Sequence, residues 1–257
     1  MVILVAEGFM DGTDQLFWPH MSYIPPEIIP NEVNLNNAGF FYDQNDGMFI
    51  KHYIIIPEKY YYNHDDANKY GIHPIGTICH EMGHVFGLPD LYDTRDVPPN
   101  EKIHDVGDWG LMESGNWRNQ TSPAYMSAWS RYTLGFIHPL FLEGISQETQ
   151  VDITPAEFAD IGAAYILPMD SNLPNEYLII ENRQQKGSDS YLKKPGLLIW
   201  HIDETFTDIF PASISVNVNS DYLGVNLIQA DGNHQFDTSS GGAGSGHPFP
   251  GSNDVTS

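Results

Sequence analysis

The pattern of apolar and polar positions predicts strands near the start of the chain, because short apolar runs rich in β-branched residues end at turn-forming residues. Residues 2–6 form such a run and predict a short, fully buried strand. Residues 49–56 predict a second strand, which we expect to pair with the first. Residues 9–42, between them, are rich in Pro, Asn and Gly, which predicts loops or irregular structure.

Residues 75–86 have helical periodicity, since their apolar positions recur at intervals of three and four. We expect this helix to end at Gly87, because glycine accepts the left-handed conformation common at helix ends. His80, Glu81 and His84 then lie on or beside the face opposite the apolar one.

A second helix is predicted before the middle of the chain. Ser122 suits the N-cap position and Pro123 the first helical position, while Gly135 suits the end. After Pro139 the pattern changes to strands, which we expect at residues 165–167, 177–181, 197–202 and 225–229.

These elements predict a mixed α/β (α+β) fold in two parts. Residues 1–138 form the region with the helices, and residues 139–257 form a β-rich part of the same domain. The Gly/Ser-rich residues 239–246 predict a flexible loop rather than a phosphate-binding loop, because no strand precedes them and no Gly-Lys-Ser/Thr follows.

Composition narrows the class of protein. A chain of 257 residues with 41% hydrophobic residues has enough apolar surface for a folded globular domain. The net charge of −23 argues against nucleic acid or anionic lipid as a partner. No apolar run approaches the roughly 20 residues of a membrane span. Residues 1–6 are too short, and lack the basic start, for a signal peptide. Cys79 is the single cysteine, so no intramolecular disulfide can form.

The sequence His80-Glu81-Met82-Gly83-His84 is an H-E-x-x-H motif on the first predicted helix. Because residues four apart lie on one helix face, both imidazoles can bind one Zn²⁺ ion. Glu81 then projects toward the open coordination position, where a carboxylate can act as general base and later as general acid. This combination predicts metal-assisted hydrolysis of an amide bond.

The motif extends to H-E-x-x-H-x-x-G-x-x-D through Gly87 and Asp90, and a match of this length is expected by chance only about 0.0002 times in such a chain. A third ligand can reach the metal only if the chain turns sharply out of the helix, which Gly87 permits and Pro89 maintains. Asp90 is therefore the predicted third ligand. A helix-terminal or calcium-binding role is the alternative for Asp90 or its neighbour Asp93.

With a methionine turn after Asp90, this motif resembles the metzincin clan of zinc endopeptidases. Met112 is the best candidate for the turn, and would form an apolar floor beneath the metal ligands without binding the metal. The resemblance narrows to the M6 family, the immune inhibitor A-like metallopeptidases. Residues 80–93, 108–117, 122–136 and 177–203 carry it, and residues 229–232 and 247–251 are also similar to the family pattern.

The resemblance implies a metzincin-like zincin catalytic domain with an active-site helix and a Met-turn, followed by a β-rich C-terminal subdomain. It also implies a secreted bacterial zinc endopeptidase that acts on protein or peptide substrates, is often made as a zymogen and often binds Ca²⁺. Against the family pattern, we expect residues 1–138 to be N-terminally incomplete and residues 139–257 to be truncated. Ser114 stands where some metzincins have a tyrosine that assists the metal site, so no tyrosine is assigned to transition-state stabilisation.

Weaker signals remain outside this motif. His201 and Asp203 face the same way on a predicted strand and could approach a metal, although a structural hydrogen-bonded pair is the simpler reading. A calcium site among the acidic residues after Asp90 is a hypothesis; it would use Asp93, Asp96, Asp105 and Asp108.

Two further groups are interpreted structurally. Residues 43–47 predict a turn between strands rather than an EF-hand, since Met48 and Ile54 stand where that loop needs Gly and Glu. We interpret His73, His104 and His138 as surface or loop histidines, because they lack ligand spacing.

The leading hypothesis is a zinc-dependent endopeptidase with Glu81 as general base and acid. The alternative is a non-catalytic, zinc-stapled binding or adhesion module of a secreted protein, against which the intact Glu81 argues, since a structural zinc does not need that carboxylate. A third hypothesis is that this chain folds poorly by itself and is inactive, although the longer protein from which it comes is a protease.

Overall fold

The structure is a computed structural model that describes most of the chain. The described residues are 2–10, 19–23, 41–43, 48–50, 52–61, 70–98, 101, 106–119, 121–142, 150–158, 161–169, 175–207, 216–219, 222–233 and 244–251. They fall into two compact units, Met1–Phe86 and Gly87–Ser257. The division at residue 138 into a catalytic region and a β-rich part stays a prediction.

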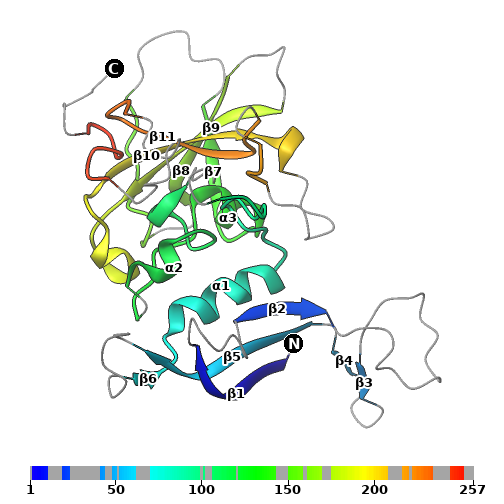
Figure 1. Ribbon diagram of the computed structural model, residues 1–257. Helices are drawn as coiled ribbons and strands as arrows, with labels where there is room; N and C mark the ends of the chain where they lie inside the picture. The colour runs from blue at the N-terminus through cyan, green and yellow to red at the C-terminus, as the bar shows by residue number, and fades with distance from the viewer. Residues whose placement is uncertain are drawn as a thin grey trace. The chain divides into compact units, whose positions relative to one another are not determined.

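The first unit is built on a four-stranded sheet (Figure 1). Strand β5 (His52–Tyr61) is its centre: β1 (Val2–Met10) pairs with it in parallel, and β2 (His20–Tyr23) and β6 (Tyr70–Ile72) pair with it antiparallel. Helix α1 (Ile75–Val85) packs against β2 and β5. Strands β3 (Phe41–Asp43) and β4 (Met48–Ile50) form a separate antiparallel pair.

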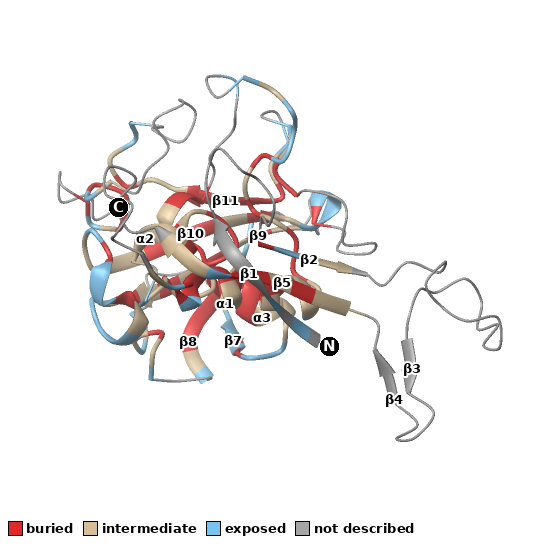
Figure 2. Cartoon of the chain, turned by 60° about the horizontal axis from the view of Figure 1, so that its bottom comes forward, coloured by how far each residue is buried: buried red, intermediate tan, exposed pale blue. Residues whose placement is uncertain are grey.

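The expected pairing of the first two strands is confirmed, because Ile3 lies opposite Ile54 in the β1–β5 register. The expected full burial of the first strand is wrong: Ile3 is 43% and Val5 65% exposed, whereas Ile54 is completely buried. Figure 2 shows the same contrast between the strands, with exposed stretches on β1 and buried ones on β5. The reason is position in the sheet, since β1 is an edge strand and β5 is flanked on both sides. The antiparallel β3–β4 pair agrees with the predicted turn, of which residues 44–47 lie outside the described residues.

The second unit is built on a five-stranded sheet in the order β11-β10-β9-β8-β7. All neighbours are antiparallel except β7 and β8, which are parallel. Each of the four strands predicted after Pro139 is present, and β7 is an additional one. The strands are β7 (His138–Phe141), β8 (Ile161–Pro168), β9 (Glu176–Arg183), β10 (Gly196–Asp203) and β11 (Val225–Ile228).

Alternation along the central strands decides which face of this sheet is covered. Every second residue of β9 and β10 is buried, as the period of two in a strand requires. Leu198, Trp200 and Ile202 therefore belong to the core of this unit, which they share with Leu91 and Met112. Two short helices, α2 (Gly115–Arg118) and α3 (Ala128–Thr133), belong to the same unit, and α3 contacts β9 and β10.

The predicted start of the second helix at Ser122 is wrong. Helix α3 begins at Ala128, with Ser127 as its N-cap accepting a hydrogen bond from the Ser130 N–H. Tertiary contacts take precedence before that point: the Tyr125 N–H donates to Asp189, and the Tyr125 carbonyl accepts from Leu111, so this backbone is unavailable to a helix. The predicted end is confirmed, since Gly135 follows the helix with a φ of 70°.

Among the described residues, no helix has the length and apolar character needed to cross a membrane.

Candidate metal centre

Helix α1 places its two histidines one turn apart on one face. Pro74 precedes it in an extended conformation, and the helix ends at Val85, before Gly87 with a φ of 104°. This end confirms the prediction that a glycine in the left-handed region terminates the helix. The rings of His80 and His84 lie 4.8 Å apart between centroids, because residues four apart are neighbours on a helix.

The face of α1 that carries these side chains is the buried one. His80 is 5% and Glu81 6% exposed, whereas Ile75 and Phe86 are each 52% exposed. The predicted apolar face is thus partly exposed, and the polar face is covered. Burying an imidazole and a carboxylate costs free energy unless they have partners. Buried titratable groups of this kind are typical of a functional site.

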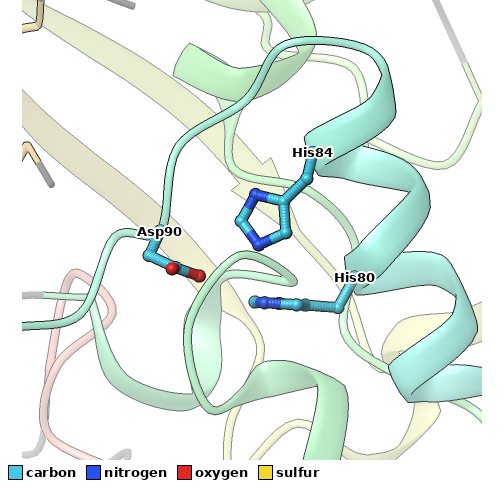
Figure 3. Close-up of side chains that lie close together, drawn as sticks. All are labelled: His80, His84 and Asp90. Carbon is cyan, nitrogen blue, oxygen red and sulfur yellow. The ribbon is translucent and has the colours of Figure 1, made fainter. Parts of the chain in front are cut away.

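Asp90 lies close to the two histidines (Figure 3). One ligand atom from each of His80, His84 and Asp90 lies within 4.8 Å of the others. Within the described part of the chain, this is the group of acidic, His or Cys side chains close enough together to hold a metal ion. Two imidazole nitrogens and one carboxylate oxygen are the donor set that zinc accepts, so the residues present fit the ion that the motif predicts.

Met112 lies in a tight turn whose backbone contacts the residue after Asp90. The Leu91 N–H donates to the Met112 carbonyl over 2.8 Å, and both residues are fully buried. The turn is closed by Gly115, whose N–H donates to the Gly110 carbonyl. A Cβ at Gly115 would lie 2.4 Å from that oxygen, so only glycine fits. Ser114 in this turn hydrogen-bonds to the Glu113 carboxylate. A role for Met112 as the floor of the metal site stays a prediction.

A buried ion network holds the segment that leads into this turn. Arg183, on β9, is fully buried and donates to both oxygens of Asp189, to Glu181 and to the Trp109 carbonyl. Burial by itself lowers the pKa of Arg183, but the Asp189 and Glu181 carboxylates outweigh it and raise that pKa, so the guanidinium stays charged.

Glu181 extends this network to other elements. Its oxygens accept from the Trp200 ring N–H over 2.8 Å and from Arg131 over 2.6 Å. Arg183, Glu181 and Asp189 were not singled out from the sequence as site residues. The available signal was the placing of Glu181 and Arg183 two apart on an otherwise apolar strand, which puts both charges on the core face.

Segments that carried the family resemblance meet at Trp109. Its ring N–H donates to Nδ1 of His247 over 3.1 Å, its carbonyl accepts from Arg183, and the His247 carbonyl accepts from the Ala230 N–H. Burial lowers the pKa of His247, which favours the neutral ring whose Nδ1 can accept this hydrogen bond. Residues 108–117, 177–203, 229–232 and 247–251 are therefore parts of one packed region.

Other sequence candidates lie apart from the metal centre. His201 pairs with Glu176 over 3.1 Å, and the Asp203 carboxylate accepts from the Thr205 N–H, so both have structural partners. His73 lies in the loop between β6 and α1, as one form of the prediction had it, but it is not a surface residue. It is 5% exposed, contacts the Tyr60 ring edge-on, and has a pKa lowered to about 4 by burial. His138 is exposed, as expected, and His104 lies outside the described residues.

The acidic residues after Asp90 give no support to a calcium site. Asp93 accepts three side-chain hydrogen bonds from Arg95, and Asp108 forms an ion pair with Arg118 over 2.5 Å. Asp96 is exposed, and Asp105 lies outside the described residues. Two of the four carboxylates are thus neutralised by arginines rather than available as a cluster of anionic ligands.

Comparison with known families gives this geometry a context. Residues 6–139 match the model of the immune inhibitor A peptidase M6 catalytic domain. The chain belongs to this family. The match includes α1, Asp90 and the Met112 turn, and it confirms the resemblance inferred from the motifs.

Two curated relatives are similar to part of this M6 chain. Both are pre-pro-metalloproteases named PrtV, from Vibrio cholerae serotype O1 strains M66-2 and ATCC 39315 / El Tor Inaba N16961. Each is 39% identical over 75 residues, which is 26% of this chain and 8% of the relative. The matched stretch is thus a small part of those proteins. Together with the family, it supports a metallopeptidase.

Proposed function

We propose that this M6 chain is a zinc-dependent endopeptidase in which His80, His84 and Asp90 bind one Zn²⁺ ion. The observation that carries the proposal is the approach of their three ligand atoms to within 4.8 Å of one another. Three protein ligands leave a fourth position open, which is the arrangement of catalytic rather than structural zinc sites.

Glu81 supplies the proton transfer. A zinc ion in this site would polarise the scissile carbonyl and make a nearby water more acidic. Glu81 follows His80 in α1 and is 6% exposed, so its carboxylate is largely removed from bulk solvent. It accepts a proton from the attacking water and donates it to the leaving amine, which completes hydrolysis of the peptide bond.

Strand β2 is the proposed binding edge for the substrate backbone. It pairs with β5 on one side and ends the described path β1-β5-β2 of the first sheet. It also contacts α1, the helix that carries His80, His84 and Glu81. An extended peptide can add to such an edge through main-chain hydrogen bonds, which would present a protein segment rather than a small molecule to the site.

We further propose that the protein acts outside the cell. The curated relatives are described as pre-pro-metalloproteases, a name that denotes a leader and a pro-segment in those proteins. The family resemblance carries the same expectation. Fractionation of the native host, with detection of the protein in the culture medium or in the cells, tests this point.

The test of the mechanism compares the parent chain with Glu81→Gln. We expect both to bind one equivalent of zinc, because Glu81 is not a ligand, and casein hydrolysis to fall about 10²- to 10⁴-fold in the variant, because general base catalysis is lost. Zinc content is measured by elemental analysis and hydrolysis with a labelled casein. Full activity of Glu81→Gln would refute the mechanism. Zinc binding without hydrolysis in the parent would instead point to truncation, an unmet activation step or the zinc-stapled binding module.

A further inference from the structure

Leu91, the residue after Asp90, is held through both of its backbone polar groups. Its N–H donates to the Met112 carbonyl over 2.8 Å, and its carbonyl accepts from the side-chain amide of Asn217 over 3.1 Å. Leu91 itself is fully buried. Two segments that are distant in the sequence thus define where the backbone beside Asp90 runs.

Asn217 has its whole amide engaged in this arrangement. It is fully buried, its Nδ2 also donates to the Val225 carbonyl over 2.7 Å, and its Oδ1 accepts from the Val225 N–H over 3.1 Å. These partners use both donor hydrogens and the acceptor oxygen, so they determine the orientation of the amide. Val225 is the first residue of β11, which gives Asn217 a rigid base in the sheet.

The close approach of this segment to β11 depends on Gly224. A Cβ there would lie 2.4 Å from the Val216 side chain and 2.8 Å from the Phe206 carbonyl oxygen. Val216 and Val225 pack in the same core as Leu91. The position of Asn217 relative to Leu91 is therefore determined by packing on both sides as well as by its hydrogen bonds.

Asp90 needs such support because it is not part of a helix or strand. The two histidines are spaced by the hydrogen bonds of α1, whereas Asp90 lies in irregular structure after Pro89. An aspartate side chain is short, so a shift of its backbone moves the carboxylate by nearly the same amount. Metal affinity depends steeply on such ligand placement.

We propose that Asn217 is a positioning residue for the third metal ligand: its amide holds the Leu91 carbonyl and thereby fixes the backbone from which Asp90 extends its carboxylate. This inference rests on the proposed role of Asp90 as a metal ligand. The competing explanation is that Asn217 only anchors the start of β11 through Val225. The two differ in whether loss of the amide changes the metal site beyond its effect on stability.

The test compares Asn217→Ala with Asn182→Ala in the full chain. Asn182 is the control, because its Nδ2 also donates to a backbone carbonyl, that of Ile153, over 3.1 Å, in a different part of the unit. It is half-buried, and its Oδ1 accepts from Gln184. Three quantities are measured for each: the dissociation constant for Zn²⁺ by chelator competition, the visible absorption of the Co²⁺-substituted protein, and the thermal midpoint of the metal-free chain.

We expect Asn217→Ala to raise the zinc dissociation constant about 10- to 100-fold, the range found when outer partners of metal ligands are removed, and to alter the Co²⁺ spectrum. Asn182→Ala should change neither, even where its thermal midpoint falls by a similar amount. If Asn217→Ala does not fold, Asn217→Asp replaces it, since the aspartate retains an acceptor for the Val225 N–H and lacks the donors to the Leu91 and Val225 carbonyls.

Zinc affinity and Co²⁺ spectrum equal to the parent in the Asn217 variant would overturn the proposal. Equal weakening in both variants would overturn it too, because it would reflect general destabilisation. Asp90→Ala separates this result from a failure of the proposed function. If Asp90→Ala binds zinc as tightly as the parent, Asp90 is not a ligand, and the function and the positioning role fall together.

Discussion

The histidines of α1 and the aspartate that follows them are held by different kinds of structure. His80 and His84 keep their spacing through the hydrogen bonds of one helix, so the nearest neighbours in the chain are sufficient. Asp90 lies beside Leu91, whose carbonyl is bound by an asparagine 126 residues further along the chain. A motif that is compact in the sequence can therefore include a residue whose backbone neighbour is held by a segment far along the chain.

The same contrast extends to charge. The buried carboxylate of Glu81 and imidazole of His80 come from one helix, α1. The buried charges of the Arg183 network come instead from two elements, β9 and the short 3-10 helix Gly187–Tyr191. Arg183 and Asp189 are each almost completely buried, and they form a two-bond pair. Such a pair costs desolvation energy, so its main effect is to require one arrangement of the segments it joins.

Among the substitutions that test this comparison, Arg183→Met should have the largest effect on stability. We expect a loss of about 3–5 kcal/mol in the free energy of unfolding, because Asp189 would be left buried without its cationic partner, and Glu181 would keep only Arg131. Urea unfolding of the metal-free chain measures it. Lys186→Met removes the same charge from the exposed connection between β9 and β10, where the Lys186 ammonium lies 5.3 Å from the centroid of the Phe158 ring. It should change stability by no more than about 1 kcal/mol. Similar losses in the two variants would contradict the importance of the network.

Gly87→Ala tests whether the local turn after α1 determines where Asp90 lies. With a φ of 104°, Gly87 is in a region that costs an alanine about 1–2 kcal/mol, although the space around it is open. The strain should appear both as lost stability and as weaker zinc binding, since this turn leads the chain from His84 to Asp90. Gly232→Ala, at a φ of 64° in the second unit, should lower stability by a comparable amount and leave zinc affinity unchanged. Unchanged zinc affinity in Gly87→Ala would show that the turn does not set the position of Asp90.

Ser127→Ala tests the corrected start of α3. Loss of the N-cap oxygen that accepts from Ser130 should lower stability by about 1 kcal/mol. Ser122→Ala is the control at the position predicted from the sequence, where the hydroxyl bonds the Ser188 carbonyl instead of capping a helix. Chemical unfolding of both variants gives the comparison, and a loss at Ser122 larger than at Ser127 would argue for the earlier helix start.

The last expected effect is a pH dependence of stability through His247. Its pKa in the folded protein lies below the value of about 6.5 for an unfolded chain, because burial opposes protonation and outweighs the attraction of Asp231 and Asp108. The unfolded chain therefore binds more protons. Stability from this group is complete above about pH 6.5 and is lost as the pH falls below it.

The measurement is the unfolding free energy of metal-free parent and His247→Asn between pH 7.5 and 5.5. The parent should lose no more than about 1.4 kcal/mol per pH unit through this group, and the variant should have a shallower slope. His73, with a pKa lowered to about 4, contributes in the same direction and remains in both proteins. Equal slopes would exclude His247 as a source of the dependence.

Much of the fold followed from local patterns. The end of α1 at a glycine, the pairing of the first strands and the four strands after Pro139 were all predicted, because a period of two or of 3.6 is visible within a few residues. Errors arose where distant groups act on the backbone. The backbone of Tyr125, before Ser127, is hydrogen-bonded to Leu111 and Asp189. Local helix propensities cannot predict partners that lie elsewhere in the chain.

For the site, the sequence by itself determined that two imidazoles lie on one helix face with Glu81 beside them and Asp90 beyond a glycine turn, because helix geometry links spacing to position. Only the tertiary structure decided that Asn217 holds Leu91, that Arg183 holds the segment before Met112, and that His247 meets Trp109. Those contacts join residues far apart in the chain. They depend on how the sheet of the second unit packs, and no local periodicity records that packing.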